Sequence, residues 1–158
     1  MFQIGDKVVH PMHGAGIVDS IVQKKVDGVM RDYYIMKLPS RSMVVMIPTE
    51  NCEEIGVRPV VDREQADRVL AAIPSIQVEM TANWNHRYRE NMERMKSGDL
   101  LEVARVIKGL TVRDTKRGLS TGERKMLHSA RQILISELVL SKSLSYEAME
   151  EALDHALA

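Results

Sequence analysis

The sequence predicts an α+β protein, with a small β-rich domain over residues 1–59 and an all-helical domain over residues 60–158. Short runs of β-branched and aromatic residues, separated by Gly, Pro, Asn or Asp, fill the first 58 residues, which is typical of strands joined by turns. After residue 60 the apolar residues recur with a helical period, and capping residues stand where each period begins or ends. This change of pattern near residue 60 divides the chain into its two predicted domains.

Four or five short strands are expected in the N-terminal domain, within the segments KVVH, AGIVDSIVQKKV, RDYYIMKL and SMVVMIP. Asp27 and Gly28 lie between the second and third segments and both tolerate positive φ, which predicts a hairpin. Gly14 and Gly16 in HPMHGAG permit a tight bend or a close approach of two backbones. So many strands in fewer than 60 residues predict a small, curled sheet or barrel.

About five helices are expected after residue 60. Asp62 with Gln65, and Ser120 with Glu123, have the spacing of a capping box and predict two of the helix starts. Gly118 predicts a helix end. The expected helices cover residues 63–73, 83–96, 100–117, 122–142 and 145–157.

Composition and motifs point away from a membrane protein or an enzyme. No run of about 18 apolar residues is present, and residues 1–10 lack the basic and apolar segments of a secretory signal. With a single cysteine, Cys52, the chain is expected to be a reduced, cytoplasmic protein. His10 and His13 have H-x-x-H spacing without further ligand candidates nearby, and no glycine loop has the following helix and lysine that phosphate binding needs. We therefore expect no catalytic site, no metal and no cofactor.

The chain is neutral in total, but its charge is unevenly distributed. Residues 80–134 hold twelve Lys and Arg against six Asp and Glu, a balance of +6, whereas residues 135–158 have a balance of −4 and residues 1–79 a balance of −2. A basic middle segment suggests a surface that faces a polyanion. A solvated helical face would show the same charges, so charge by itself leaves both interpretations open.

The only tryptophan, Trp84, lies in the segment TANWNHRYREN within this basic region. On a helix it forms a stripe with Tyr88, Met92 and Met95, as expected of residues packed in a core. It also lies in the first helical turn, next to cations, where a large apolar side chain is suited to wedge into a DNA minor groove. The spacing alone supports both interpretations.

Several stretches resemble the bacterial CarD/CdnL transcription regulators. NWNHRYREN followed by SGDLLEVARVIKGL, RDTKRGLSTGERKML and ARQILISELVLS is similar to their helical domain. GDKVVHPMHGAGIV is similar to the start of their RNA-polymerase-interacting domain, which transcription–repair coupling factors share. The resemblance covers about residues 1–145 in the family's order. It implies a Tudor-like β-barrel that docks on the polymerase β-subunit through an exposed strand, and a helical domain that approaches promoter DNA.

The resemblance further implies that Trp84 wedges into the minor groove at the upstream edge of the melted −10 region and slows collapse of the bubble. Tyr88, Met92 and Met95 would then anchor the helix inward, while cations beside Trp84 hold phosphates without reading sequence. The expected DNA-binding residues are Trp84, Asn83, His86, Arg87, Arg89, Arg113 and Lys125. The expected polymerase-binding residues are Lys24, Arg41, Met43, Val45, Met46 and Pro48.

Two sites depart from the family pattern. Met43 and Met46 stand where some relatives carry charge, so the polymerase contact is expected to be backbone pairing along a sheet edge with apolar packing. His86 stands where several relatives place an arginine, which makes a phosphate contact weaker and more sensitive to pH. The expected protein is a monomer associated with the nucleoid. The alternative is a protein–protein adaptor whose helical domain, including the acidic helix 145–157, binds a protein instead of DNA.

Overall fold

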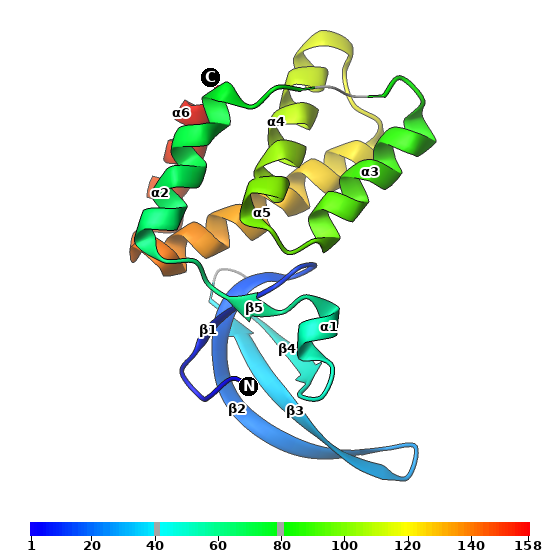
Figure 1. Cartoon of the computed structure of the whole chain (residues 1–158), viewed down its shortest axis with the longest axis vertical. Coiled ribbons are helices and arrows are strands. Elements are labelled where there is room, and N and C mark those ends of the chain that lie inside the picture. The colour runs from blue at the N-terminus through cyan, green and yellow to red at the C-terminus, as the bar shows by residue number, and fades with distance from the viewer. Residues whose placement is uncertain (40–41, 79–80) are drawn as a thin grey trace.

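The computed structural model describes residues 1–39, 42–78 and 81–158, and it is an antiparallel sheet followed by helices, which confirms the α+β class (Figure 1). The strands are β1 (Lys7–His10), β2 (Gly14–Val26), β3 (Val29–Leu38), β4 (Met43–Pro48) and β5 (Arg58–Pro59), ordered β4-β3-β2-β1-β5. The helices are α1 (Cys52–Ile55), α2 (Arg63–Ala72), α3 (Trp84–Lys96), α4 (Leu100–Arg117), α5 (Thr121–Lys142) and α6 (Tyr146–Leu157), with a short 3-10 helix η1 (Ile73–Ser75) after α2. We refer to residues 1–59 as the β half and to residues 60–158 as the helical half.

The long β2–β3 hairpin forms because Asp27 and Gly28 adopt the left-handed backbone that a two-residue turn needs. Their φ angles are 50° and 79°, and Val26 pairs with Val29 across the turn, which confirms the predicted hairpin. β4 pairs with β3 only as far as Tyr33. The tip of the hairpin therefore projects from the sheet as a two-stranded ribbon (Figure 1).

Side chains alternate between a core face and an outer face of the sheet. The core face holds Val18, Tyr34, Met36 and Ile47, each almost fully buried. Residues directly opposite one another on neighbouring strands share a face, so the register defines the outer face. Where β2, β3 and β4 all pair, its members are Ile17, Ser20, Val22, Tyr33, Ile35, Lys37, Val44, Met46 and Pro48. The outer face is therefore largely apolar, and it is half-buried or exposed along these strands.

The helices of the helical half enclose a common apolar core, to which α4 and α5 contribute most of the buried side chains. Asp62 caps α2 by accepting the Gln65 N–H, and Ser120 forms a capping box with Glu123 at the start of α5, as predicted. One element differs from the prediction: the single-turn helix α1 was not expected. Pro74 follows the end of α2 and lies in the first turn of η1. Proline fits there because its missing N–H is not needed in a first turn.

The helical half rests on the β half through α5, which packs against β2 (Figure 1). Ser136 Oγ on α5 accepts a hydrogen bond from Ala15 N at 2.9 Å. A Cβ atom on Gly14 would lie 2.8 Å from the same hydroxyl oxygen, and Gly14 has a φ of +97°. Glycine at position 14 is thus required both by the backbone conformation and by the close approach of α5.

Gly16→Ala is expected to destabilise the β half by about 3 kcal/mol, because a Cβ atom would press on the Lys37 carbonyl oxygen and lie 2.9 Å from Met36 Cε. Gly28→Ala is the matched control. Its φ of +79° disfavours alanine, but nothing lies within 4 Å, so we expect a loss of about 1 kcal/mol. Urea denaturation followed by circular dichroism measures both losses, and equal losses would contradict the close packing at Gly16.

Candidate functional site

Trp84 lies at the start of α3, with its ring exposed on one side and fixed on others. The Asn83 side chain caps α3 by accepting the His86 N–H at 3.0 Å, so the first turn presents Trp84 at the helix tip. Trp84 is 41% exposed. Its ring stacks on Tyr88 with centroids 5.0 Å apart, and its Nε1–H donates to Ser120 Oγ at 2.9 Å. The indole is therefore accessible and yet held in one orientation.

The structure contradicts the assignment of Arg87 as an exposed phosphate ligand. Arg87 is only 3% exposed, and its guanidinium forms an ion pair with Glu123, with Nε–Oε2 at 2.8 Å and Nη2–Oε1 at 3.3 Å. Its Nη1 donates to the carbonyl oxygens of Thr81 and Ala82 at 3.0 and 3.1 Å. Because these partners occupy the guanidinium, Arg87 joins α3 to α5 and to the segment before α3.

Glu123 connects this buried ion pair to the indole through Ser120. Ser120 Oγ donates a hydrogen bond to Glu123 Oε1 at 3.2 Å. Ser120 Oγ also accepts two hydrogen bonds, from the Glu123 backbone N–H at 3.2 Å and from the Trp84 Nε1–H at 2.9 Å. Desolvation by burial tends to raise the pKa of Glu123, but the hydrogen bonds and charge of Arg87 outweigh it, so the pKa lies below its ordinary value. The ionised carboxylate therefore stabilises the cap of α5, and that cap orients the tryptophan.

Five exposed cations lie within five residues of Trp84 or Ser120 along the chain and form no ion pair within the described residues. They are Arg89 on α3, Lys116 and Arg117 at the end of α4, and Arg124 and Lys125 in the first turns of α5. The starts of α3 and α5 meet where Trp84 contacts Ser120, and each helix start carries a partial positive charge. An anion at this point would therefore meet two helix starts and nearby cationic side chains.

Sequence reasoning missed Ser120, Lys116, Arg117 and Arg124 as members of this site. The capping box identified Ser120 as a helix start, but capping is a local property. It does not reveal that α5 begins beside Trp84, 36 residues earlier in the chain. Because Trp84 and Ser120 are far apart in the sequence, their contact could not be predicted from local patterns.

The remaining expected DNA-binding residues are placed differently from one another. His86 pairs with Glu90, with Nε2–Oε1 at 2.9 Å, so a protonated His86 would already have a carboxylate partner. Arg113 is half-buried in a hollow of about 200 Å³ whose lining includes none of the residues that contact the indole. Lys125 lines a different hollow of about 190 Å³, together with Tyr88 and four methionines. Of these candidates, Lys125 shares a hollow with Tyr88, whereas Arg113 shares one with Arg117 at the end of α4.

β4 forms one edge of the described sheet, with β3 on one side and no strand on the other. Met46 and Pro48 belong to the outer face, whereas the Val45 side chain packs against the core. Val45 would therefore meet a partner mainly through its backbone, the kind of contact expected along a sheet edge. Val44, which the sequence prediction omitted, is 55% exposed on the outer face. The two-residue period of a strand, applied to MVVMIP, separates the residues on the outer face from those on the core face.

Three further residues were expected at the polymerase surface. Met43 is exposed at the start of β4, and Lys24 is exposed on the projecting hairpin, opposite Arg31. Arg41 lies outside the described residues. The expected set is thus spread over the edge strand and the hairpin.

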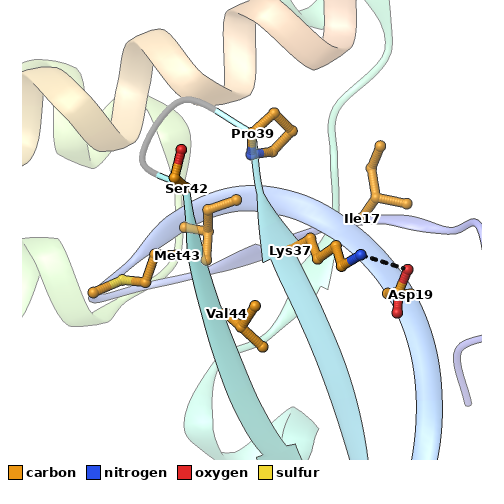
Figure 2. A pocket seen from close by; sticks show the side chains of 8 residues that line it. Ile17, Asp19, Lys37, Pro39, Ser42, Met43 and Val44 are labelled. Carbon is orange, nitrogen blue, oxygen red and sulfur yellow. Dashed lines mark ion pairs between the residues drawn. The ribbon is translucent and has the colours of Figure 1, made fainter.

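A hollow of about 550 Å³ opens on the outer face next to β4 (Figure 2). Ile17 and Val44 contribute apolar side chains to its lining. Lys37 lies between them and pairs with Asp19 at 3.3 Å. Because both charged groups are exposed, this ion pair adds little to stability. The result is an apolar depression beside an open backbone edge, which is suited to an extended strand from a partner.

The two histidines with H-x-x-H spacing pack against each other, with ring centroids 4.6 Å apart and ring planes tilted by 51°. Burial, and then the charge of His13, lower the pKa of His10 to about 4, so His10 is neutral at pH 7. Within residues 1–39, 42–78 and 81–158, no three or more His, Cys, Asp or Glu side chains gather as a metal site requires. Over the same described ranges, every helix is too short or too polar to cross a membrane.

Arg87→Met is expected to lower the free energy of unfolding by about 3–5 kcal/mol, because it leaves Glu123 charged and buried without its partner. Arg89→Met is the matched control, since Arg89 is an exposed arginine on the same helix, and its loss is expected to stay within about 0.5 kcal/mol. Urea denaturation measured by Trp84 fluorescence compares the two. Similar stabilities would show that the buried pair is not formed.

Acid should remove the contribution of Glu123 to stability. The folded pKa lies below the ordinary value of 4.5, so the contribution is complete above pH 4.5 and disappears as the pH falls through the folded pKa. The stability advantage of wild type over Glu123→Gln should therefore shrink below pH 4.5. His10 also titrates on acidification, but it is present in both proteins and cancels in the difference. Urea denaturation across pH gives that difference, and a constant value would contradict the assignment.

Both halves of the chain match known protein families. A family model described as CarD-like/TRCF RID domain matches residues 2–61, and one described as CarD, C-terminal domain matches residues 68–154. A protein of Bacillus subtilis (strain 168) described as "Putative transcription factor YdeB" is 34% identical over 145 residues, which cover 92% of this chain and 95% of the relative. With both domains matched in order and a relative of nearly the same length, the chain belongs to the CarD-like family of transcription factors.

Proposed function

We propose that this protein binds the RNA polymerase β-subunit through the β4 edge and stabilises the open promoter complex by inserting Trp84 into the minor groove at the upstream edge of the bubble. Membership of the CarD-like family supports a role in transcription. The observation that carries the proposal is the exposed indole, fixed by Tyr88 and Ser120 where two helix starts meet. A monomer acting at the nucleoid is part of the same proposal.

The DNA contact needs an apolar wedge and cations that accept any sequence. An inserted ring replaces part of the base stacking lost at a distorted junction, and aromatic stacking on a base contributes about 1–3 kcal/mol. Arg89, Arg117, Arg124 and Lys125 have free positive charges for neighbouring phosphates, which carry no sequence information. Arg87 has a different role in this proposal: it keeps the two helix starts together and does not touch DNA.

The polymerase contact is proposed to be strand addition at β4. An edge strand offers unpaired N–H and C=O groups to an extended partner strand, and the apolar residues beside it supply packing. Val44 and Met46 are exposed on the outer face for this purpose, with Lys24 on the hairpin as a charged contributor. The match of residues 2–61 to a polymerase-interacting domain supports this contact.

Stabilisation of the open complex requires that the protein bind the open promoter complex more tightly than the closed one. A protein that binds the melted promoter more tightly than the closed one shifts the equilibrium by its difference in affinity. A tenfold difference corresponds to about 1.4 kcal/mol, which one stacking contact can provide. Insertion of Trp84 is therefore enough for a tenfold preference for the open complex, without sequence-specific contacts.

Trp84→Ala is expected to leave the fold intact, because the ring is 41% exposed, and to reduce the lifetime of open complexes about tenfold relative to the wild-type protein. Lifetimes are measured by competitor challenge with purified polymerase holoenzyme. Leu144→Ala is the matched control, since Leu144 is an apolar residue of similar exposure, 47%, in the turn before α6. Its lifetime should equal that of wild type.

Three outcomes would oppose the proposal. A folded Trp84→Ala protein with a wild-type lifetime would exclude the wedge, and a variant that unfolds the helices would show Trp84 to be a core residue. An unchanged Trp84 fluorescence with forked promoter DNA, both with and without polymerase, would favour the protein–protein adaptor.

A further inference from the structure

The connection between the β half and the helical half is short and fully hydrogen-bonded. β5 ends at Pro59 and α2 begins at Arg63, which leaves three residues between them. Val60 N donates to Lys7 O at 3.0 Å, Val61 N donates to Glu137 Oε2 at 2.9 Å, and Asp62 caps α2. Each linking residue is therefore hydrogen-bonded to one half or the other, unlike an ordinary domain linker.

Arg58 and Glu137 form the central contact across this junction. The Arg58 guanidinium on β5 makes a two-pronged ion pair with Glu137 on α5, with Nη1–Oε2 at 2.6 Å and Nη2–Oε1 at 2.7 Å. The Glu137 side chain is 0% exposed, so this geometry is shielded from water. Arg58 Nε also donates to the Gly98 carbonyl oxygen, in the turn between α3 and α4. One arginine of the β half thus contacts the turn that follows α3, the helix with Trp84 at its far end, and also contacts α5, whose start orients the indole.

Other contacts restrain the same junction. Lys7 Nζ donates to Leu140 O at 3.2 Å. A Cβ atom on Gly98 would lie 3.3 Å from Gly56 O, which shows how closely the α3–α4 turn approaches the end of α1. Together with the contact between Ser136 and Ala15, these bonds surround the Arg58–Glu137 pair. A rotation of one half against the other would break several of them at once.

We propose that Arg58 and Glu137 are positioning residues that make the chain a rigid spacer, fixing Trp84 at a set distance and angle from the β4 edge. The inference rests on the proposed function, in which β4 and Trp84 engage polymerase and DNA in the same complex. Two binding sites joined in one molecule increase each other's affinity only where the connection between them lets both sites bind at the same time. The Arg58–Glu137 pair supplies that link here.

The dimensions make the angle at the junction important. α3 has 13 residues, so at 1.5 Å per residue Trp84 lies about 20 Å from the other end of α3, which leads into the turn that contacts the β half. A rotation of about 10° at the junction would move the indole by about 3 Å, close to the spacing of about 3.4 Å between successive bases. A loosened junction would therefore misplace the wedge by about one base step.

The test uses Arg58→Gln together with Glu137→Gln, because removing both charges leaves no buried carboxylate without a partner. The control is Arg131→Gln together with Asp154→Asn, which removes another ion pair of α5, at 2.7 Å, but one that joins α5 to α6 inside the helical half. Spin labels at Glu54→Cys on α1 and Glu150→Cys on α6, in a Cys52→Ala background, report the distance between the halves. If the double variant does not fold, Arg58→Lys replaces it, since lysine keeps the charge without the two-pronged geometry.

Four measurements are made on each protein: the width of the spin-label distance distribution, affinity for a purified polymerase β fragment, affinity for forked promoter DNA alone, and open-complex lifetime with holoenzyme. For the Arg58/Glu137 variant we expect at least a twofold broader distribution, both affinities within about twofold of wild type, and an about tenfold smaller extension of lifetime. The control variant should match wild type in all four. A merely structural role would not change lifetime while sparing both affinities.

An unchanged distance distribution would show that the pair does not hold the halves together. A broad distribution with a wild-type lifetime would show that a fixed geometry is not needed. Either result overturns the proposal. If the wild-type protein itself fails to extend the lifetime, the proposed function fails and the spacer role fails with it, while the distance distributions still decide whether Arg58 and Glu137 fix the junction.

Discussion

Two buried glutamates on α5 determine how the rest of the molecule is arranged around this helix. Glu123 near its start binds Arg87 of α3, and Glu137 further along binds Arg58 of β5. Burying a charge is costly unless a partner compensates it, so each carboxylate requires its arginine in one position. Such pairs add little net stability compared with apolar packing, but moving one partner away leaves a buried charge uncompensated, at a cost of about 3–5 kcal/mol. The two pairs therefore restrain the placement of α3 and of the sheet relative to α5.

Local features of the fold could be read from the sequence, and partners distant in sequence could not. Asp27 and Gly28 encode their turn, and Ser120 encodes its cap, because the relevant interactions span only a few residues. Arg87 shows the limit. Its burial depends on Glu123, 36 residues away on another helix, and a charged side chain beside a helix tip otherwise suggests exposure. The tip position of Trp84 was predicted correctly, whereas the ion pair that supports it was not.

The two exposed surfaces differ in chemistry, which explains why total charge is a poor guide to this chain. The outer face beside β4 is apolar, and the region around the starts of α3 and α5 is cationic. The acidic residues of α6 offset those cations in the sum, although α6 packs on α2 and α5. Association with a polyanion depends on the local potential, and a neutral chain can present a strongly positive region.

Ser120 has two structural roles, since its hydroxyl both caps α5 and accepts a hydrogen bond from the Trp84 indole N–H. At most helix starts Ser, Asp and Asn are nearly interchangeable. Here Asp would bring a second carboxylate against Glu123, and Asn would change which atoms donate and accept. A substitution at position 120 that still caps the helix would therefore change how the indole ring is held, so the choice of cap residue is limited by a side chain from a different helix.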